Sequence, residues 1–174
     1  GQEELIIGTH NGYSVRFKEN ILRDMGRTAT GVKGVNLRDG DFVVGSSTIN
    51  DSQEVLVVSE NGLGKRTSAE HYPTKGRGGK GIKVMNVTER TGKLAGLVTV
   101  NGSEDLMLIT DTGVVIRTNV DNISQTGRSA QGVKVMRLDE DAKLVTFALV
   151  ASEVELTAAD QTETGSEEVA SEAD

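Results

Sequence analysis

The sequence that decides the fold occurs three times, as Leu5-Ile-Ile-Gly-Thr-His-Asn-Gly-Tyr-Ser-Val-Arg16, Val55-Leu-Val-Val-Ser-Glu-Asn-Gly-Leu-Gly-Lys-Arg66 and Leu106-Met-Leu-Ile-Thr-Asp-Thr-Gly-Val-Val-Ile-Arg117. In each copy two short apolar runs flank a glycine, at position 12, 62 or 113, and the second run ends on an arginine. This pattern predicts a β-hairpin. Asn-Gly in the first two copies predicts a two-residue type I′ turn, in which both central residues have a positive φ.

The match continues through the rest of each repeat. A Gly-Arg segment follows the hairpin at residues 26–33, 76–83 and 127–134, and each repeat ends with another apolar run. We expect a third strand at residues 32–37, 82–87 and 133–138, and a fourth strand after the polar turn that follows. The sequence therefore predicts an all-β, propeller-like fold of three four-stranded antiparallel units, at about residues 4–52, 53–103 and 104–152.

The composition is that of an ordinary soluble globular protein. Charged residues make up 26% of the chain, hydrophobic residues 36% and aromatic residues only 3%, and there is no Cys. The last stretch, residues 153–174, holds eight acids and no Lys or Arg, so it accounts for the net charge of −7. We expect residues 1–152 to form the blades, residues 153–174 to be a disordered acidic tail, and the protein to be cytoplasmic, with no membrane partner.

Residues for catalysis or metal binding are scarce. The two histidines, His10 and His71, fall at different positions of their repeats. The acidic cluster at residues 139–141 lacks the spacing of a calcium loop. No phosphate loop of the Gly-x-x-x-x-Gly-Lys-Ser/Thr type occurs. We therefore expect that this chain is not itself an enzyme and holds no metal or other cofactor.

Basic residues recur at fixed positions of the repeat. They form three sets: Arg16, Arg66 and Arg117 at the hairpin ends, Arg27, Arg77 and Arg128 in the Gly-Arg segments, and Lys33, Lys83 and Lys134 directly after them. Neighbouring blades place equivalent residues along an arc, and an arc of cations suits a bent phosphate backbone. For the hairpin-end arginines, salt bridges between blades are an equally good interpretation.

The middle repeat is the most basic, and its Gly-Arg segment is the densest point. That segment is Lys75, Gly76, Arg77, Gly78, Gly79, Lys80 and Gly81, and Lys65 stands in the hairpin before it. Its glycines would let the backbone approach a phosphate closely; the alternative is a flexible turn with solvated charges. The residues we expect to contact DNA are Arg16, Arg27, Lys33, Lys65, Arg66, Lys75, Arg77, Lys80, Lys83, Arg117, Arg128 and Lys134.

The segment Lys75-Gly-Arg-Gly-Gly-Lys-Gly81 resembles the Gln-Arg-Arg-Gly-Gly-Lys-Gly signature box in the C-terminal domain of DNA gyrase A subunits. Four other stretches are similar to the same family: Met25 to Val32, Asn61 to Thr67, Glu70 to Thr74, and Thr110 to Thr118. The box begins Lys-Gly instead of Gln-Arg. It also lies in the second of three repeats, whereas in the family the intact box marks the first blade. The chain thus resembles the last three blades of that domain.

The resemblance implies a β-pinwheel that wraps duplex DNA around a basic rim, with little dependence on base sequence. Wrapping would support ATP-dependent negative supercoiling, in partnership with the rest of the gyrase A polypeptide and the subunit that carries the ATPase. The cleavage tyrosine and the ATPase lie elsewhere in that family. Two alternatives remain: the equivalent domain of topoisomerase IV, and a protein-binding propeller scaffold with no role on DNA.

Overall fold

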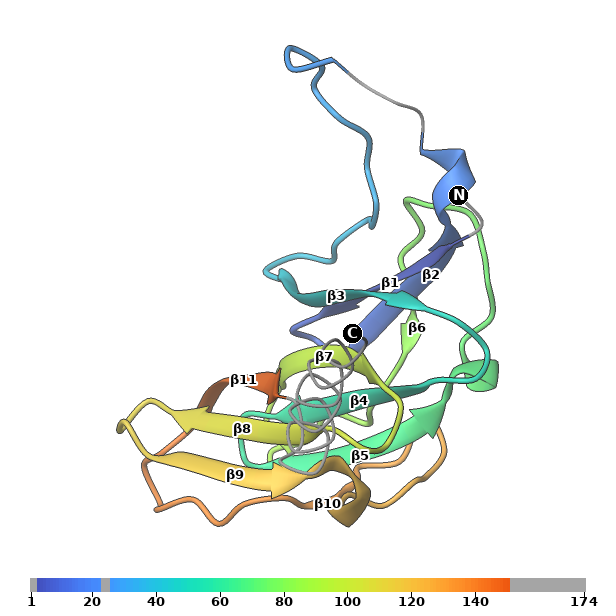
Figure 1. The fold of residues 1–174 in the computed structure, drawn as a ribbon. Coiled ribbons are helices and arrows are strands. Elements are labelled where there is room, and N and C mark those ends of the chain that lie inside the picture. Colours follow the sequence, from blue (N-terminus) through green and yellow to red (C-terminus); the bar gives the residue numbers. More distant parts are fainter. Residues whose placement is uncertain (1–2, 23–25, 151–174) are drawn as a thin grey trace, which may run out of the picture.

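The computed structural model describes residues 3–22 and 26–150, so the predicted acidic tail lies outside the described residues. Three antiparallel sheets follow one another, one for each repeat (Figure 1). The strands are β1 (Glu4–Thr9), β2 (Tyr13–Lys18), β3 (Val43–Ile49), β4 (Glu54–Ser59), β5 (Leu63–Ser68), β6 (Ile82–Lys83), β7 (Leu94–Val100), β8 (Asp105–Thr110), β9 (Val115–Asn119), β10 (Val133–Lys134) and β11 (Leu144–Val150). A 3₁₀ turn follows each hairpin, at η1 (Glu19–Ile21), η2 (Ala69–His71) and η3 (Val120–Asn122).

Each repeat builds the same core of three strands. Its hairpin pairs β1 with β2, β4 with β5, or β8 with β9, and the closing apolar run returns antiparallel to the first strand of that hairpin. The prediction of an all-β fold made of propeller-like blades is confirmed.

The hairpin turns differ from the predicted type I′. The N–H of Gly12 donates to the carbonyl of Thr9 at 3.0 Å, and Gly12 has φ +88°. No residue other than glycine has a positive φ in residues 3–22 and 26–150. The connection is therefore a type I turn followed by a left-handed glycine. The type I′ prediction was wrong because the loop has three residues, so only its last position needs the left-handed conformation.

The fourth strand of a blade comes from the following repeat, which the sequence did not reveal. β6 pairs with β2, and β10 pairs with β5, giving the sheet orders β3-β1-β2-β6 and β10-β5-β4-β7. Residues 32–37 form no strand, and the third sheet has three strands among the described residues. The second and third repeats do contain four strands, with β6 and β10 inside the predicted ranges 82–87 and 133–138 but only two residues long. The prediction of a strand at residues 32–37 was wrong, and the sheets are not closed within a repeat, because this strand takes its partner from the repeat before it.

The core lies between the sheets. One cluster, which includes Ile6, Val57 and Leu97, fills the space between the first two repeats, and a second, which includes Leu56 and Leu108, fills the space between the last two. β4 is buried on both faces, with Val55 through Val58 at 0% exposure. An unbroken apolar run is what such a strand requires.

Strands β3, β7 and β11 lie side by side on the inner side of the blades (Figure 1). Two glycines permit this close approach. A Cβ on Gly45 would lie 2.3 Å from the carbonyl oxygen of Leu97, and one on Gly96 would lie 2.6 Å from the ring of Phe147. The opposite edges of the first two sheets are formed by β6 and β10, which carry the Gly-Arg segments to the outer rim. No helix in the described part of the chain is long and apolar enough to cross a membrane.

Candidate nucleic-acid interface

The three Gly-Arg segments lie next to one another on the outer rim. We call them loop 1 (residues 26–36), loop 2 (residues 75–83) and loop 3 (residues 126–134). The N–H of Gly78 donates to the carbonyl of Gly34 at 2.7 Å, and the N–H of Asn36 donates to the carbonyl of Gly79 at 2.9 Å, so loop 1 is joined to loop 2. Arg128 joins loop 3 to loop 2 through the carbonyl of Lys83.

One contact recurs at equivalent positions of this arc. The guanidinium of Arg77 lies at 3.4 Å from the carbonyl oxygen of Lys33, and that of Arg128 lies at 2.7 Å from the carbonyl oxygen of Lys83. Each arginine therefore sits beside the lysine of the preceding repeat. Arg27, the third member of the set, is exposed in loop 1. The repeat thus places cations in pairs along the rim.

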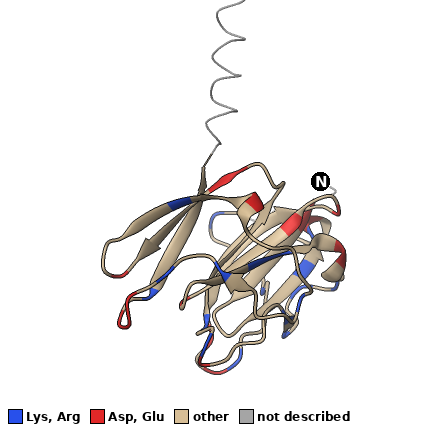
Figure 2. Ribbon diagram, turned by 90° about the horizontal axis from the view of Figure 1, so that it is seen from below, with Lys and Arg blue, Asp and Glu red and all other residues tan. Residues whose placement is uncertain are grey.

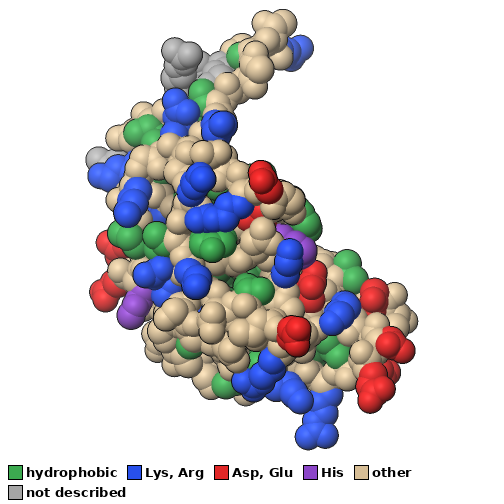
Figure 3. Space-filling view, turned by 180° about the vertical axis from the view of Figure 1, so that it is seen from behind, with side chains coloured by type: hydrophobic (Ala, Val, Ile, Leu, Met, Phe, Trp, Pro, Cys, Tyr) green, Lys and Arg blue, Asp and Glu red, His purple; other side chains and the backbone are tan. Residues whose placement is uncertain are grey.

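The lysines of the arc face solvent. Lys33, Lys75, Lys80, Lys83 and Lys134 are all exposed. None of their ammonium groups forms an ion pair with a carboxylate of the described residues. Basic positions occur on all three sheets (Figure 2), and blue Lys and Arg side chains outnumber acidic ones over much of the face in Figure 3. These ammonium groups are available to neutralise phosphates.

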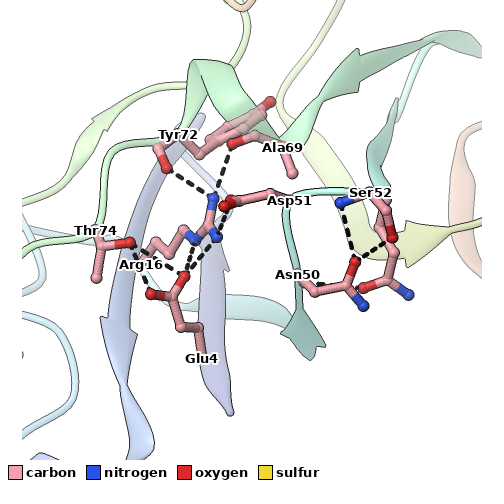
Figure 4. A network of polar contacts seen from close by, with 9 residues as sticks. Glu4, Arg16, Asn50, Asp51, Ser52, Ala69, Tyr72 and Thr74 are labelled. Atoms are coloured by element: carbon pink, nitrogen blue, oxygen red, sulfur yellow. Dashed lines mark hydrogen bonds and ion pairs between the residues drawn. The ribbon is translucent and has the colours of Figure 1, made fainter. Parts of the chain in front are cut away.

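Arg16, by contrast, is a structural tie. Only 5% of it is exposed. Its guanidinium pairs with Glu4 at 2.5 Å and with Asp51 at 2.7 Å, and it donates to the carbonyls of Ala69 at 2.9 Å and Tyr72 at 3.1 Å (Figure 4). These partners come from both sides of the junction between the first and second repeats. Arg16 therefore links two blades, but it does so by hydrogen bonds to carbonyls, since both of its salt bridges are to residues of its own repeat.

Arg66 repeats this arrangement one blade later. It pairs with Glu54 of its own hairpin at 2.7 Å and donates to the carbonyl of Ile123 in the third repeat, also at 2.7 Å. Arg117 is 41% exposed on its side chain and pairs with Asp105 of its own hairpin at 2.8 Å. We place none of the three hairpin-end arginines in the candidate interface, because each of their guanidinium groups is already paired with a carboxylate.

Lys65 is also held inside the protein. Its exposed fraction is 0%, and its ammonium donates to the carbonyl of Gly127 at 2.8 Å and to that of Arg128. Burial, and secondarily the charge of Arg128, lowers the pKa of Lys65 to about 8. This lysine fastens the start of loop 3 to the second blade, so the structure assigns it a supporting position.

One basic residue of the rim was missed from the sequence. The guanidinium of Arg38 lies 3.5 Å from the ring centroid of Tyr13, and it donates to the carbonyl of Lys80 at 2.5 Å. Arg38 has no counterpart, since Thr88 and Asp139 stand at the equivalent positions. A search for repeated charges therefore could not find it, although its place in a polar turn next to loop 1 was a weak signal.

The side chains of the rim are cationic and not of the metal-binding kind. In the described ranges, no group of three or more His, Asp or Glu side chains could hold a metal ion. The arrangement of exposed cations on adjacent backbone loops suits the binding of an extended polyanion.

Comparisons with known proteins all indicate the same family. The family described as "DNA gyrase C-terminal domain, beta-propeller" matches at residues 3–50, 53–101 and 104–151, once for each repeat. The chain is 49% identical over 170 residues to the A subunit of DNA gyrase from Staphylococcus aureus strain MRSA252, and the match covers 97% of this chain and 19% of that protein. It is 52% identical over 157 residues to the corresponding protein of strain NCTC 8325, covering 89% of this chain and 18% of that protein.

Solved structures agree with these relatives. The structure of a DNA gyrase A C-terminal domain superposes with a TM-score of 0.78 and 26% identity, covering 85% of this chain and 50% of that one. The C-terminal domain of a DNA topoisomerase IV superposes with a TM-score of 0.84 and 26% identity, covering 94% and 52%. With the family matched in all three repeats and half of the residues shared with gyrase A subunits, the chain belongs to the β-pinwheel family of DNA gyrase C-terminal domains.

Proposed function

We propose that this chain binds duplex DNA along the arc of loops 1, 2 and 3 and bends it around the outer rim. The observation that carries the proposal is the joining of the three loops, loop 1 to loop 2 by backbone hydrogen bonds and loop 3 to loop 2 by Arg128, with exposed cations at equivalent positions of each. The residues proposed to contact phosphates are Arg27, Lys33, Lys75, Arg77, Lys80, Lys83, Arg128 and Lys134. Arg16, Lys65, Arg66 and Arg117 support the blades that carry them.

The expected mode of binding is sequence-tolerant. Cations that follow the rim reach phosphate oxygens, and phosphate contacts fix position without reading bases. The described residues contain no α-helix that could enter the major groove. DNA that follows several blades must bend, so sequences that deform easily should bind somewhat more tightly.

The wider role is proposed from the family. The chain spans 19% of the length of the gyrase A protein that it matches over 170 residues. We propose that it is a non-catalytic part of such a protein, located in the cytoplasm, with residues 1–152 as the DNA-binding blades and residues 153–174 as a tail. Its partners would be duplex DNA, the rest of the gyrase A polypeptide and, through it, the ATPase subunit. DNA wrapped on the rim would support ATP-dependent negative supercoiling.

The dependence of affinity on salt tests the proposal. Binding to a duplex of about 40 base pairs should give a steep negative slope of log K against log salt, because each neutralised phosphate releases about 0.9 counterion. The double variant Arg77→Ala, Lys80→Ala should flatten that slope by about two. The double variant Lys18→Ala, Lys93→Ala removes the same charge from exposed positions outside the arc and should leave the slope nearly unchanged. A flat slope for the unaltered chain would overturn the proposal and favour a protein-binding scaffold.

Sequence identity, and not the fold, favours a gyrase A parent over the topoisomerase IV alternative. Both solved C-terminal domains share 26% of their residues with this chain. The relatives at 49% and 52% identity are gyrase A subunits, and we therefore propose a gyrase A protein as the parent of this chain.

A further inference from the structure

A cavity of about 220 Å³ lies between β2 and loop 2. Its two ends are closed by the backbone. At one end the N–H of Lys75 donates to the carbonyl of Arg16 at 2.8 Å, and at the other Ser14 pairs with Ile82 in the β2–β6 ladder. Between these two points the loop arches away from β2. The volume falls below the roughly 300–1,000 Å³ of drug-sized sites, so an occupant has to be small.

The cavity exists because of one residue difference between equivalent positions. Val15 in β2 corresponds to Lys65 in β5, counted from Gly12 and Gly62. At the second junction the Lys65 side chain occupies the space beneath loop 3 and reaches the carbonyls of Gly127 and Arg128. The Val15 side chain is three heavy atoms shorter than a lysine side chain, since it ends at Cγ. The corresponding space beneath loop 2 therefore stays open.

The lining is largely apolar and includes two buried residues that carry hydroxyl groups, Ser14 and Tyr72. Val15, Pro73 and Ile82 contribute apolar surface. Ser14 is 2% exposed, and its hydroxyl has no hydrogen-bond partner among the described residues. A buried polar group without a partner is destabilising, and a ligand oxygen at this point would supply the missing hydrogen bond.

The charge at the cavity decides which ligand fits. Lys75 and Lys80 line it, and Thr126 and Gln131 stand at the equivalent positions of loop 3. No acidic side chain lines the cavity, and Arg16, its third cation, is already paired with Glu4 and Asp51. An ammonium group like that of Lys65 would therefore meet two unpaired lysines here. An anion would be attracted by both.

We propose that this cavity binds a small amphiphilic carboxylate, with an apolar body against Val15, Pro73 and Ile82 and a carboxylate between the ammonium groups of Lys75 and Lys80. The Ser14 hydroxyl donates a further hydrogen bond to an oxygen of the ligand. A bound carboxylate neutralises the two lysines that the arc offers to phosphate. It therefore lowers the affinity for DNA, a consequence that rests on the proposed function, whereas binding of the carboxylate does not.

Amide NMR titration with benzoate tests the site. We expect saturable shifts of Val15, Gly76, Gly79 and Ile82, and at least tenfold weaker binding of benzamide, which has the same shape without the charge. Lys75→Gln, Lys80→Gln should weaken benzoate binding about tenfold or more. Equal affinity for benzoate and benzamide, or the absence of saturable shifts at these amides, would overturn the proposal.

The substitution Val15→Met separates filling of the cavity from charge. Its longer apolar side chain should occupy the space, and it changes no charge. A loss of benzoate binding in a variant that keeps its fold therefore comes from filling. Retained binding in Val15→Met would refute the site.

Competition with DNA is measured separately. Saturating benzoate should lower the affinity of the unaltered chain for a duplex of about 40 base pairs at least threefold, with no effect on Val15→Met. Benzoate binding in a chain that does not bind DNA would leave the cavity assigned and refute the wrapping proposal alone. Tight DNA binding without any benzoate shifts would support the wrapping proposal and refute the cavity site alone.

Discussion

At the scale of single residues, some of the repeated arginines link neighbouring blades and others are exposed on the rim. Their hydrogen-bond partners distinguish the two roles. Arg16 faces carboxylates and carbonyls from two repeats, whereas Arg77 meets a carbonyl at the surface. The sequence predicted the repeated positions correctly, but it could not separate the two classes. The reason is physical: the partners of Arg16 in and beside η2 are backbone oxygens, and a backbone oxygen carries no signature in the sequence.

Removing the Arg16 guanidinium should be costly for stability. In Arg16→Ala, Glu4 and the carbonyls of Ala69 and Tyr72 lose their donor inside the protein, so we expect a loss of about 2–4 kcal/mol in the free energy of unfolding. Arg117→Ala removes a half-exposed pair within one hairpin and should cost about 1 kcal/mol or less. Urea unfolding of both variants measures the difference; equal losses would contradict the assignment of Arg16 as a tie between blades.

Lys65 should make stability depend on pH in the alkaline range. Its pKa of about 8 in the folded protein lies below the ordinary lysine value of 10.5. Between these values the unfolded chain binds more protons, and stability therefore rises with pH through this window. Relative to Lys65→Met, in which all other titrating groups are kept, the unaltered chain should gain about 2–3 kcal/mol between pH 8 and 10.5. A difference between the two chains that stays constant over this range would show that the ammonium is not desolvated.

At the scale of the elements, the hairpins were predictable, whereas the third strand was predicted only in its place along the chain and not in its partner or its length. Alternating apolar runs and a turn glycine lie close together in the sequence, so local pattern is sufficient for β1 and β2. β6 is two residues long and pairs with a strand from another repeat. Its partner depends on packing between repeats, and no local pattern encodes that. The same limit hid the cavity beneath loop 2, since its emptiness follows from comparing Val15 with a lysine whose role only the structure shows.

The glycine near the end of loop 2 should tolerate no side chain. Gly81 has φ +80°, and a Cβ there would lie 2.6 Å from the carbonyl oxygen of Ser14. Gly113 has a similar φ of +83° but open space around it. We expect Gly113→Ala to cost about 1–2 kcal/mol from backbone strain alone. Gly81→Ala should cost at least twice as much and weaken DNA binding, measured by chemical unfolding and by duplex affinity. Similar costs at both positions would mean that loop 2 is free to move away from β2.

At the scale of the whole molecule, the repeats are interlocked and not merely stacked. β10 completes the second sheet from the third repeat, and the third repeat also covers Leu56 and Val58 of β4. A fragment of residues 1–103 should therefore lose both a strand and a buried face. We expect it to unfold at a clearly lower urea concentration than residues 1–150, or to aggregate, as followed by circular dichroism and light scattering. An unchanged midpoint would show that the blades are independent units.

The borrowed strand has a consequence for how the chain acquires its structure during synthesis. β6 pairs with β2, and Ile82, the first residue of β6, lies 64 residues after Lys18, the last residue of β2. A ribosome adds about 5–20 residues per second, so the first hairpin waits several seconds with an open edge before its last strand is made. Each later repeat supplies the strand that completes the preceding sheet, and its own hairpin is then left with an open edge until the next repeat is made. Maturation then proceeds in one direction along the nascent chain, and the exposed edge, a site for mispairing with other chains, moves forward with it.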